Sequence, residues 1–192
     1  MNTFSKTQKI AESAVMIALA AALREISGIL PWPFLQGGSV TLFGMVPLLI
    51  IAYRHGTKQG LLTAFAFSVI EMLFGLKNFS YVTGIGAYIV LALTDYLVAF
   101  TVLGLGGIFR DKLGGRQRRE LIAGSLVCCF LRYICHFISG MVIWGGYCPE
   151  GKAVWLYSLT YNGSYMLPEA ILTVMGVIAV CSVFDLNKKK LA

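Results

Sequence analysis

Six apolar runs, separated by short polar segments, set the hydrophobic pattern of this 192-residue chain. A helix needs about 20 apolar residues to cross the hydrocarbon core of a bilayer, whereas lipid-facing barrel strands alternate in polarity. The runs are continuous, and each predicts a membrane-spanning helix: Ile10–Leu30, Val40–Tyr53, Gly60–Leu76, Gly84–Phe109, Leu121–Trp144 and Met166–Phe184. The second run is short and contains Pro47, so neighbouring helices must cover its backbone. The pattern predicts an all-α integral membrane protein built as a six-transmembrane-helix bundle.

The composition excludes the other broad classes of protein. Apolar residues make up 57% of the chain and charged residues 13%, whereas a soluble domain has about half and about a quarter. A soluble protein with this composition would expose one large apolar patch, and disordered chains are far less hydrophobic. The sequence has no internal repeat, linker or low-complexity segment, so we expect residues 1–192 to form a single transmembrane domain.

The basic residues fall unevenly between the two sides of the expected membrane. Most of the 16 Lys and Arg residues lie on one side: Lys6, Lys9, Arg54, Lys58, Arg110, Lys112, Arg116, Arg118, Arg119, Lys188, Lys189 and Lys190. Because cytoplasmic loops are enriched in Lys and Arg, both termini should be cytoplasmic. Three loops should then lie outside, namely Pro31–Ser39, Lys77–Thr83 and Gly145–Tyr157. The charge sits in short loops rather than on a polar domain, so we expect no nucleic-acid partner.

Familiar enzyme and metal-binding motifs are missing from the sequence. There is no Walker P-loop, no His-Glu-x-x-His and no Gly-x-Ser-x-Gly. Ser139 and His136 could be imagined as a hydrolase dyad, but they share one helix and no oxyanion-hole loop accompanies them. The five cysteines lack Cys-x-x-Cys spacing and are interpreted as packing residues. We therefore expect a protein that is not an enzyme and that holds no cofactor or metal.

Polar residues inside the spans are costly in a bilayer, which makes them functional candidates. In the fifth span, Arg132, His136, Gly140 and Trp144 recur every four residues and so share one helical face. Trp144 alone could be a belt residue at the membrane interface and His136 alone a bonded core residue, but four such positions on one stripe favour a lined cavity. Asp95 in the fourth span either pairs with Arg132 or stays available to a ligand.

Aromatic residues accompany these groups in two places. Tyr88 stands seven residues before Asp95, hence on the same helical face, with Tyr96 beside it. The segment Trp155–Tyr165, expected as an outer loop, is rich in rings and hydroxyl groups, which suits a flat heteroaromatic ligand. The alternative is an aromatic belt at the lipid boundary, against which Asn162 argues because a belt has no need of an amide.

Three further features complete the candidates. The first span carries a ridge of small residues, Ala14, Ala18 and Ala22, which lets another helix approach closely. This ridge either packs within the bundle or docks on a partner membrane protein. Glu71 and Glu169 are interpreted as structural; Glu169 follows a proline near the expected start of the sixth helix, where the helix dipole favours an anion.

Several of these residues occur in stretches that resemble a known family. The stretches are His136-Phe137-Ile138-Ser139-Gly140, Trp144, Tyr147-Cys148-Pro149-Glu150-Gly151, Trp155-Leu156-Tyr157-Ser158 and Tyr161-Asn162-Gly163-Ser164-Tyr165. Together with Gly37-Gly38-Ser39 and the pair Asp95-Tyr96, they resemble the thiamine-specific substrate-binding component (S component) of bacterial energy-coupling factor transporters. The likeness covers essentially the whole chain.

The resemblance implies a six-helix protein of the bacterial plasma membrane, with both termini inside and a thiamine site near the outer face. The residues that match the family's binding pattern are Asp95, Tyr96, His136, Gly140, Trp144, Tyr157 and Asn162. The loop Pro31–Ser39 would act as a lid over the bound vitamin. The ridge Ala14, Ala18 and Ala22 would dock on a transmembrane coupling subunit driven by two cytosolic ATPases.

The chain departs from the family pattern in two places. Some members carry Glu where this chain has Asp95, and Lys77–Tyr88 matches poorly. The expected function is capture of thiamine for ATP-driven uptake, and two alternatives stay open. The same architecture could bind another vitamin or a thiamine-precursor pyrimidine. A less favoured alternative is an ion-coupled secondary transporter that uses Glu71 or Glu169, against which the lack of an inverted repeat weighs mildly.

Overall fold

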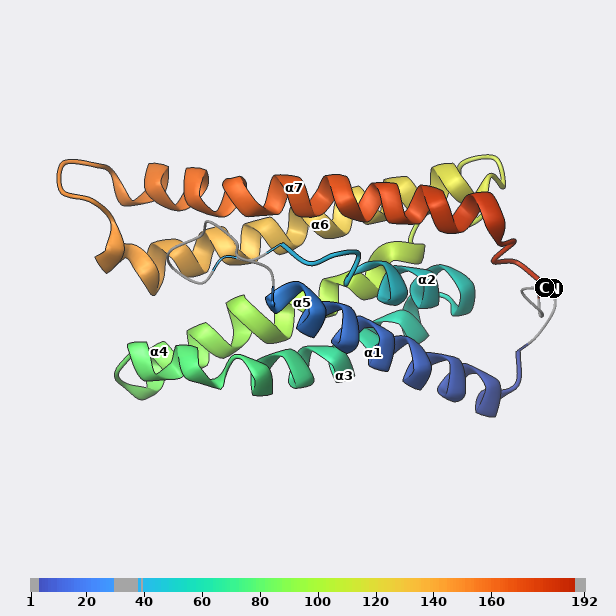
Figure 1. Cartoon of the computed structure of the whole chain (residues 1–192), viewed down its shortest axis with the longest axis horizontal. Coiled ribbons are helices and arrows are strands. Elements are labelled where there is room, and N and C mark those ends of the chain that lie inside the picture. The colour runs from blue at the N-terminus through green and yellow to red at the C-terminus, as the bar shows by residue number, and fades with distance from the viewer. Residues whose placement is uncertain (1–3, 30–37, 39, 189–192) are drawn as a thin grey trace.

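The computed structural model describes residues 4–29, 38 and 40–188, and their regular structure is helical throughout (Figure 1). The longer helices are α1 (Lys6–Gly28), α2 (Val46–His55), α3 (Thr57–Phe74), α6 (Gln117–Val142) and α7 (Val154–Val183). The short ones are η1 (Leu76–Tyr81), α4 (Ile85–Leu91), η2 (Ala92–Leu97), α5 (Val98–Thr101), η3 (Val102–Gly107) and η4 (Trp144–Tyr147). The prediction of an all-α protein is confirmed.

Each apolar run of the sequence contains a helical stretch. Three stretches are long and apolar enough to cross a membrane: Ile85–Gly107, Gln117–Val142 and Val154–Val183. The first consists of α4, η2, α5 and η3 in unbroken succession. The short helix α2 is buried along its whole length, as expected for a span that neighbours must cover. Pro47 lies in its first turn, where the missing N–H leaves no intrahelical bond unmade.

The beginning of α7 corrects the sequence-based prediction. The sixth helix was expected from Met166, with the aromatic segment before it in an outer loop; instead α7 begins at Val154 and the segment is helical. Pro168 lies inside α7, where it removes one backbone bond without ending the helix. Because Tyr157, Tyr161 and Tyr165 are four residues apart, a helical backbone stacks them on one face.

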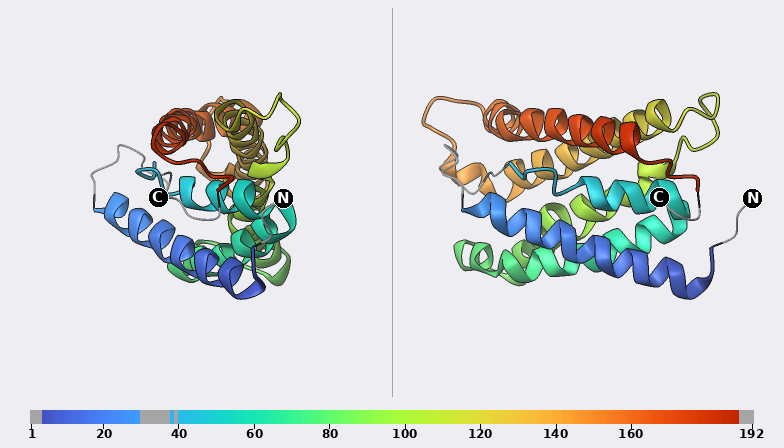
Figure 2. Two further views of the ribbon diagram at one scale, coloured as in Figure 1. Left: turned by 90° about the vertical axis from the view of Figure 1, so that its right-hand side faces the viewer. Right: turned by 45° about the vertical axis from the view of Figure 1, so that its right-hand side comes forward.

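Glycine allows the central helices to approach closely. A Cβ on Gly124 of α6 would lie 2.1 Å from the carbonyl oxygen of Gly106 in η3. A Cβ on Gly104 of η3 would lie 2.4 Å from the backbone of Leu61 in α3. Such contacts between small residues are typical of helix packing in membranes, where burial of apolar surface drives association only weakly. The result is one bundle in which α6 and α7 lie side by side and α2 is enclosed (Figures 1 and 2).

A buried polar cluster joins the two ends of the described chain at one end of the bundle. The guanidinium of Arg54 at the end of α2 is 2.7 Å from Glu12 of α1 and donates to the carbonyl oxygen of Leu186 at 3.1 Å. The ring of Phe4 packs edge-on against His55, with centroids 4.6 Å apart. The beginning of α7 and the end of α6 lie at the opposite end of the bundle (Figure 1).

Candidate functional site

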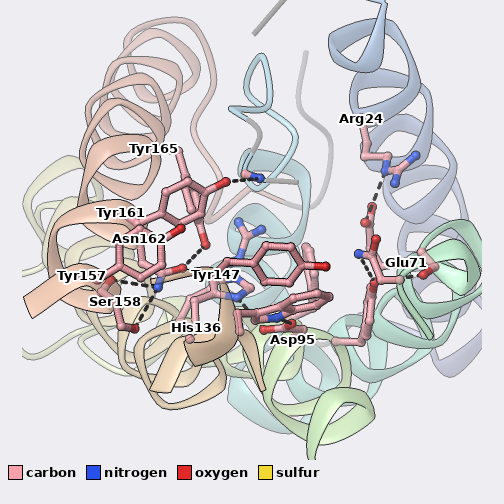
Figure 3. Close-up of a pocket in the computed structure, with 18 residues that line it drawn as sticks. Arg24, Glu71, Asp95, His136, Tyr147, Tyr157, Ser158, Tyr161, Asn162 and Tyr165 are labelled. Atoms are coloured by element: carbon pink, nitrogen blue, oxygen red, sulfur yellow. Dashed lines mark hydrogen bonds and ion pairs between the residues drawn. The ribbon is translucent and has the colours of Figure 1, made fainter. Parts of the chain in front are cut away.

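A polar cavity opens among the helices at the end of the bundle away from the Arg54 cluster. It is bounded by residues of α1, α3, η1, η2, α5, α6, η4 and α7 (Figure 3). The lining residues are Arg24, Gly38, Glu71, Gly75, Asn78, Asp95, Tyr96, Phe100, Arg132, His136, Gly140, Trp144, Tyr147, Tyr157, Ser158, Tyr161, Asn162 and Tyr165. All seven residues expected to bind ligand are among them.

Asp95 lines the cavity and lies against two ring nitrogens, one from Trp144 and one from His136. Its Oδ2 accepts a hydrogen bond from Nε1 of Trp144 at 2.9 Å, and its Oδ1 lies 3.2 Å from Nδ1 of His136. The other ring nitrogen of His136, Nε2, is buried and has no hydrogen-bond partner among the described residues. A ligand that reaches His136 would therefore satisfy a polar atom that is otherwise costly to bury.

Asp95 lies in η2, a stretch of π-helix inside the fourth apolar run. The wider turn shifts the register of the helix, so residues seven apart no longer share a face. Tyr96 points into the protein, where its hydroxyl donates to the carbonyl oxygen of Gly75 at 3.1 Å and accepts from Asn78 at 2.8 Å. Tyr88, expected on the face of Asp95, is 40% exposed and stacks on Phe79 instead.

The stripe predicted in the fifth apolar run faces the cavity: Arg132, His136 and Gly140 of α6 and Trp144 of η4 all line it. Gly140 lies where α6 closely approaches α7. A Cβ at this position would lie 2.2 Å from Oγ of Ser158 and 2.8 Å from Nδ2 of Asn162. A bare backbone is therefore required here for the two helices to hold their present separation.

The α7 side of the cavity combines stacked rings with neutral hydrogen-bonding groups. The rings of Tyr157 and Tyr161 stack with centroids 5.7 Å apart. Asn162 donates to the backbone oxygen of Ser158 at 2.9 Å and accepts from the hydroxyl of Tyr165 at 2.5 Å. The sequence analysis singled out Tyr157 and Asn162 but did not choose Ser158, Tyr161 or Tyr165; the helical spacing of four could have pointed to them.

The α1 and α3 side of the cavity carries an ion pair that the sequence analysis did not foresee. Arg24 Nε lies 3.3 Å from Oε2 of Glu71, and both residues line the cavity. Glu71 was interpreted as structural, and nothing in the sequence connects it with an arginine 47 positions earlier. Its place inside an apolar run was the only available signal.

The expected pair of Asp95 with Arg132 does not form. Arg132 Nη1 lies 3.7 Å from Oε1 of Glu169. The Glu169 carboxylate also accepts hydrogen bonds from Thr41, from the backbone N–H at Oε2 and from the hydroxyl at Oε1. The two arginines of the cavity are thus each matched to a buried glutamate. Within the part of the chain that the structure describes, Asp95 faces no Lys or Arg within ion-pair distance.

Two other expected features are the small-residue ridge on α1 and the lid segment. Ala14, Ala18 and Ala22 are exposed on α1, so they do not pack within the bundle. The expected lid, Pro31–Ser39, lies outside the described residues except for Gly38. The backbone N–H of Gly38 donates to the hydroxyl of Tyr161 at 3.2 Å, and Gly38 itself lines the cavity.

Comparison with known proteins gives one consistent result. The chain matches the family described as thiamine transporter protein over residues 10–189. It is 34% identical over 193 residues to the thiamine transporter ThiT of Bacillus subtilis strain 168, which covers 96% of this chain and 94% of that protein. It is 31% identical over 182 residues to the thiamine transporter ThiT of Lacticaseibacillus paracasei, with coverage of 88% and 84%. A solved structure of ThiT from Listeria monocytogenes shares the fold, with a TM-score of 0.70, 22% identity and coverage of 91% and 93%.

These relatives are named as transporters of bacteria, and not as enzymes, in agreement with the lack of enzyme motifs in this sequence. With its membrane-capable helices, the chain is a multi-pass protein of the bacterial plasma membrane. The resemblance drawn from the stretch between His136 and Tyr165 is confirmed: this chain belongs to the thiamine transporter family.

Proposed function

We propose that this chain binds thiamine from the outer side of the membrane, as the S component of an energy-coupling factor importer. The observation that carries the proposal is Asp95, a carboxylate held between an indole and an imidazole in a cavity walled by aromatic rings. Thiamine combines a permanently cationic thiazolium with a flat aminopyrimidine. A cation is attracted to aromatic faces and to a carboxylate, and both attractions strengthen when water is excluded.

In this proposal each of the expected binding residues has its own role in holding the ligand. Asp95 supplies the negative charge opposite the thiazolium, and the rings of Trp144 and Tyr157 supply flat apolar surface. His136 offers the ring nitrogen that lacks a protein partner among the described residues. Tyr96, Gly140 and Asn162 shape the walls against which the ligand lies. Hydrogen bonds of this kind carry specificity, because an analogue without the partner group leaves a buried polar atom unpaired.

The same proposal includes six membrane crossings and two cytoplasmic termini. It is supported by the position of Phe4 and Lys188 at one end of the bundle, beside Arg54 and Arg110. The exposed ridge Ala14, Ala18 and Ala22 would dock on the transmembrane coupling subunit, and two cytosolic ATPases would supply the energy for release inward.

Calorimetric titration of the purified chain in detergent tests the binding. We expect saturable binding of thiamine, and a loss of about tenfold or more in affinity for Trp144→Phe, which removes the donor to Asp95 and shortens the aromatic wall. Trp155→Phe is the matched control, because Trp155 is 53% exposed and does not line the cavity. Equal affinities in all three proteins would reject the assigned site.

Two alternatives have distinct outcomes. If the ligand is a precursor pyrimidine, the free aminopyrimidine should compete with thiamine at equal concentration, whereas a site built around the thiazolium should prefer thiamine. If the chain is an ion-coupled transporter, it should accumulate thiamine alone in liposomes under an ion gradient. The pairing of Glu71 with Arg24 and of Glu169 with Arg132 speaks against this, since a paired carboxylate is a poor carrier of a coupling ion.

A further inference from the structure

The cavity has a second polar end, formed by α1 and α3 on the side away from the rings of α7 (Figure 3). Glu71 lies there, 5% exposed, with Oε2 at 3.3 Å from Nε of Arg24. The second carboxylate oxygen, Oε1, is buried and has no hydrogen-bond partner among the described residues. A buried acceptor without a donor is costly, so this end of the cavity has unused capacity for one O–H or N–H group.

The charges decide which part of a thiamine ligand would reach this end. Glu71 is balanced by Arg24, whereas Asp95 has no Lys or Arg within ion-pair distance among the described residues. The permanent cation is therefore best placed beside Asp95, which lies between the α7 residues and the Arg24–Glu71 pair (Figure 3).

The two larger substituents of the thiazolium, the aminopyrimidine and the hydroxyethyl arm, then extend toward opposite sides of the ring. The aminopyrimidine is flat and rich in hydrogen-bonding groups, which suits the stacked rings of Tyr157 and Tyr161 and the amide of Asn162 on α7. With the aminopyrimidine placed there, the hydroxyethyl arm points toward Arg24 and Glu71.

Resting on the proposed function, we infer that Arg24 and Glu71 form the subsite for the ligand's terminal hydroxyl and select thiamine over its phosphate esters. A hydroxyl can donate to Oε1 of Glu71 and accept from the guanidinium of Arg24 at the same time. A phosphate ester offers mainly acceptors, and its negative charge meets the Glu71 carboxylate in a site of low dielectric constant. The pair thus combines attraction for the alcohol with repulsion of the ester.

Affinities for thiamine and thiamine monophosphate, measured for the wild type and two variants, test the inference. Glu71→Gln removes the repulsion and should shift the preference toward the monophosphate by about tenfold. Arg24→Gln leaves the charge of Glu71 without its paired cation and should shift the preference toward thiamine by a similar factor. A merely structural role would weaken both ligands together. Glu25→Gln is the control, because Glu25 also contacts Arg24 but is exposed and lies outside the cavity.

An analogue whose hydroxyl is replaced by hydrogen gives a second readout. It should bind the wild type more weakly than thiamine does, and this difference should shrink in Glu71→Gln. If Glu71→Gln does not fold, Arg24→Gln alone carries the test, since Arg24 is 31% exposed and its loss creates no cavity in the core. Thiamine binding with an unchanged preference in the variants would overturn the subsite only; a wild type that does not bind thiamine would reject the proposed function.

Discussion

The indole Nε1 of Trp144 donates a hydrogen bond to Oδ2 of Asp95 at 2.9 Å, joining two residues 49 positions apart. Asp95 lies in the π-helical segment η2, and Trp144 opens the short helix η4 that follows α6. Segments of π-helix occur often at functional sites because the extra residue turns a side chain out of the regular register. The bond holds carboxylate and indole in one arrangement before a ligand arrives, which lowers the entropy cost of binding.

Asp95→Asn separates the charge of this residue from its hydrogen bonds. The amide oxygen can still accept from Trp144, but the negative charge is lost. We expect thiamine affinity to fall by about ten- to a hundredfold, the range for a hydrogen bond to a charged group. The affinity of an uncharged aminopyrimidine should change much less. Calorimetry with both ligands measures the difference, and Asp185→Asn at the exposed end of the chain is the control; equal losses for the two ligands would contradict a role in binding the cation.

Gly140→Ala tests the close contact between α6 and α7. The added methyl would lie 2.2 Å from Oγ of Ser158, so the helices must separate or Ser158 and Asn162 must move. We expect thiamine binding to weaken by about tenfold or more. The overpacking should also lower the free energy of unfolding by about 1–3 kcal/mol. Gly86→Ala is the matched control, because no atom lies within 4 Å of its added methyl. Binding curves that coincide for the two variants would mean that the helix contact does not shape the site.

Removal of Glu169 should destabilise the protein through Arg132. The arginine is buried, lies 3.7 Å from the Glu169 carboxylate and would keep an uncompensated charge in Glu169→Ala. The expected cost is about 3–5 kcal/mol, seen as a lower melting temperature in detergent. Glu169→Gln should lose less, since an amide oxygen can still accept from Thr41. Glu150→Ala, at an exposed position, serves as the reference; a melting temperature for Glu169→Ala equal to that reference would show that the pair adds nothing.

Ala18→Phe tests the exposed ridge of α1 separately from the cavity. A large ring on the ridge should block close approach of another helix, so we expect thiamine uptake in cells to fall while binding to the purified chain is unchanged. Leu62→Phe, on an exposed position of α3, is the control for a larger apolar side chain at the protein surface. Normal uptake by Ala18→Phe would exclude this ridge as a docking face, and lost binding would mean that the change disturbs the bundle itself.

The local pattern of the sequence was sufficient for much of the site. The four-residue spacing of Arg132, His136, Gly140 and Trp144 predicted one lined face, because helical geometry places such residues above one another wherever the helix packs. The same rule applied to Tyr157 and Tyr161 would have predicted the start of α7. The sequence analysis instead placed the start of this helix at Met166, close to Pro168, whereas the structure has Pro168 well inside α7.

The partners of the charged residues were decided only by the tertiary structure. Asp95 faces His136 and Trp144 rather than Arg132, and Glu71 faces Arg24 across the gap between α3 and α1. The hydrophobic pattern determines that a segment is helical, because each backbone polar group in a membrane must be bonded within its own segment. Which carboxylate meets which arginine depends on how each helix is rotated against its neighbours. That rotation is set by close contacts such as Gly124 on Gly106, between residues that no spacing along the chain connects.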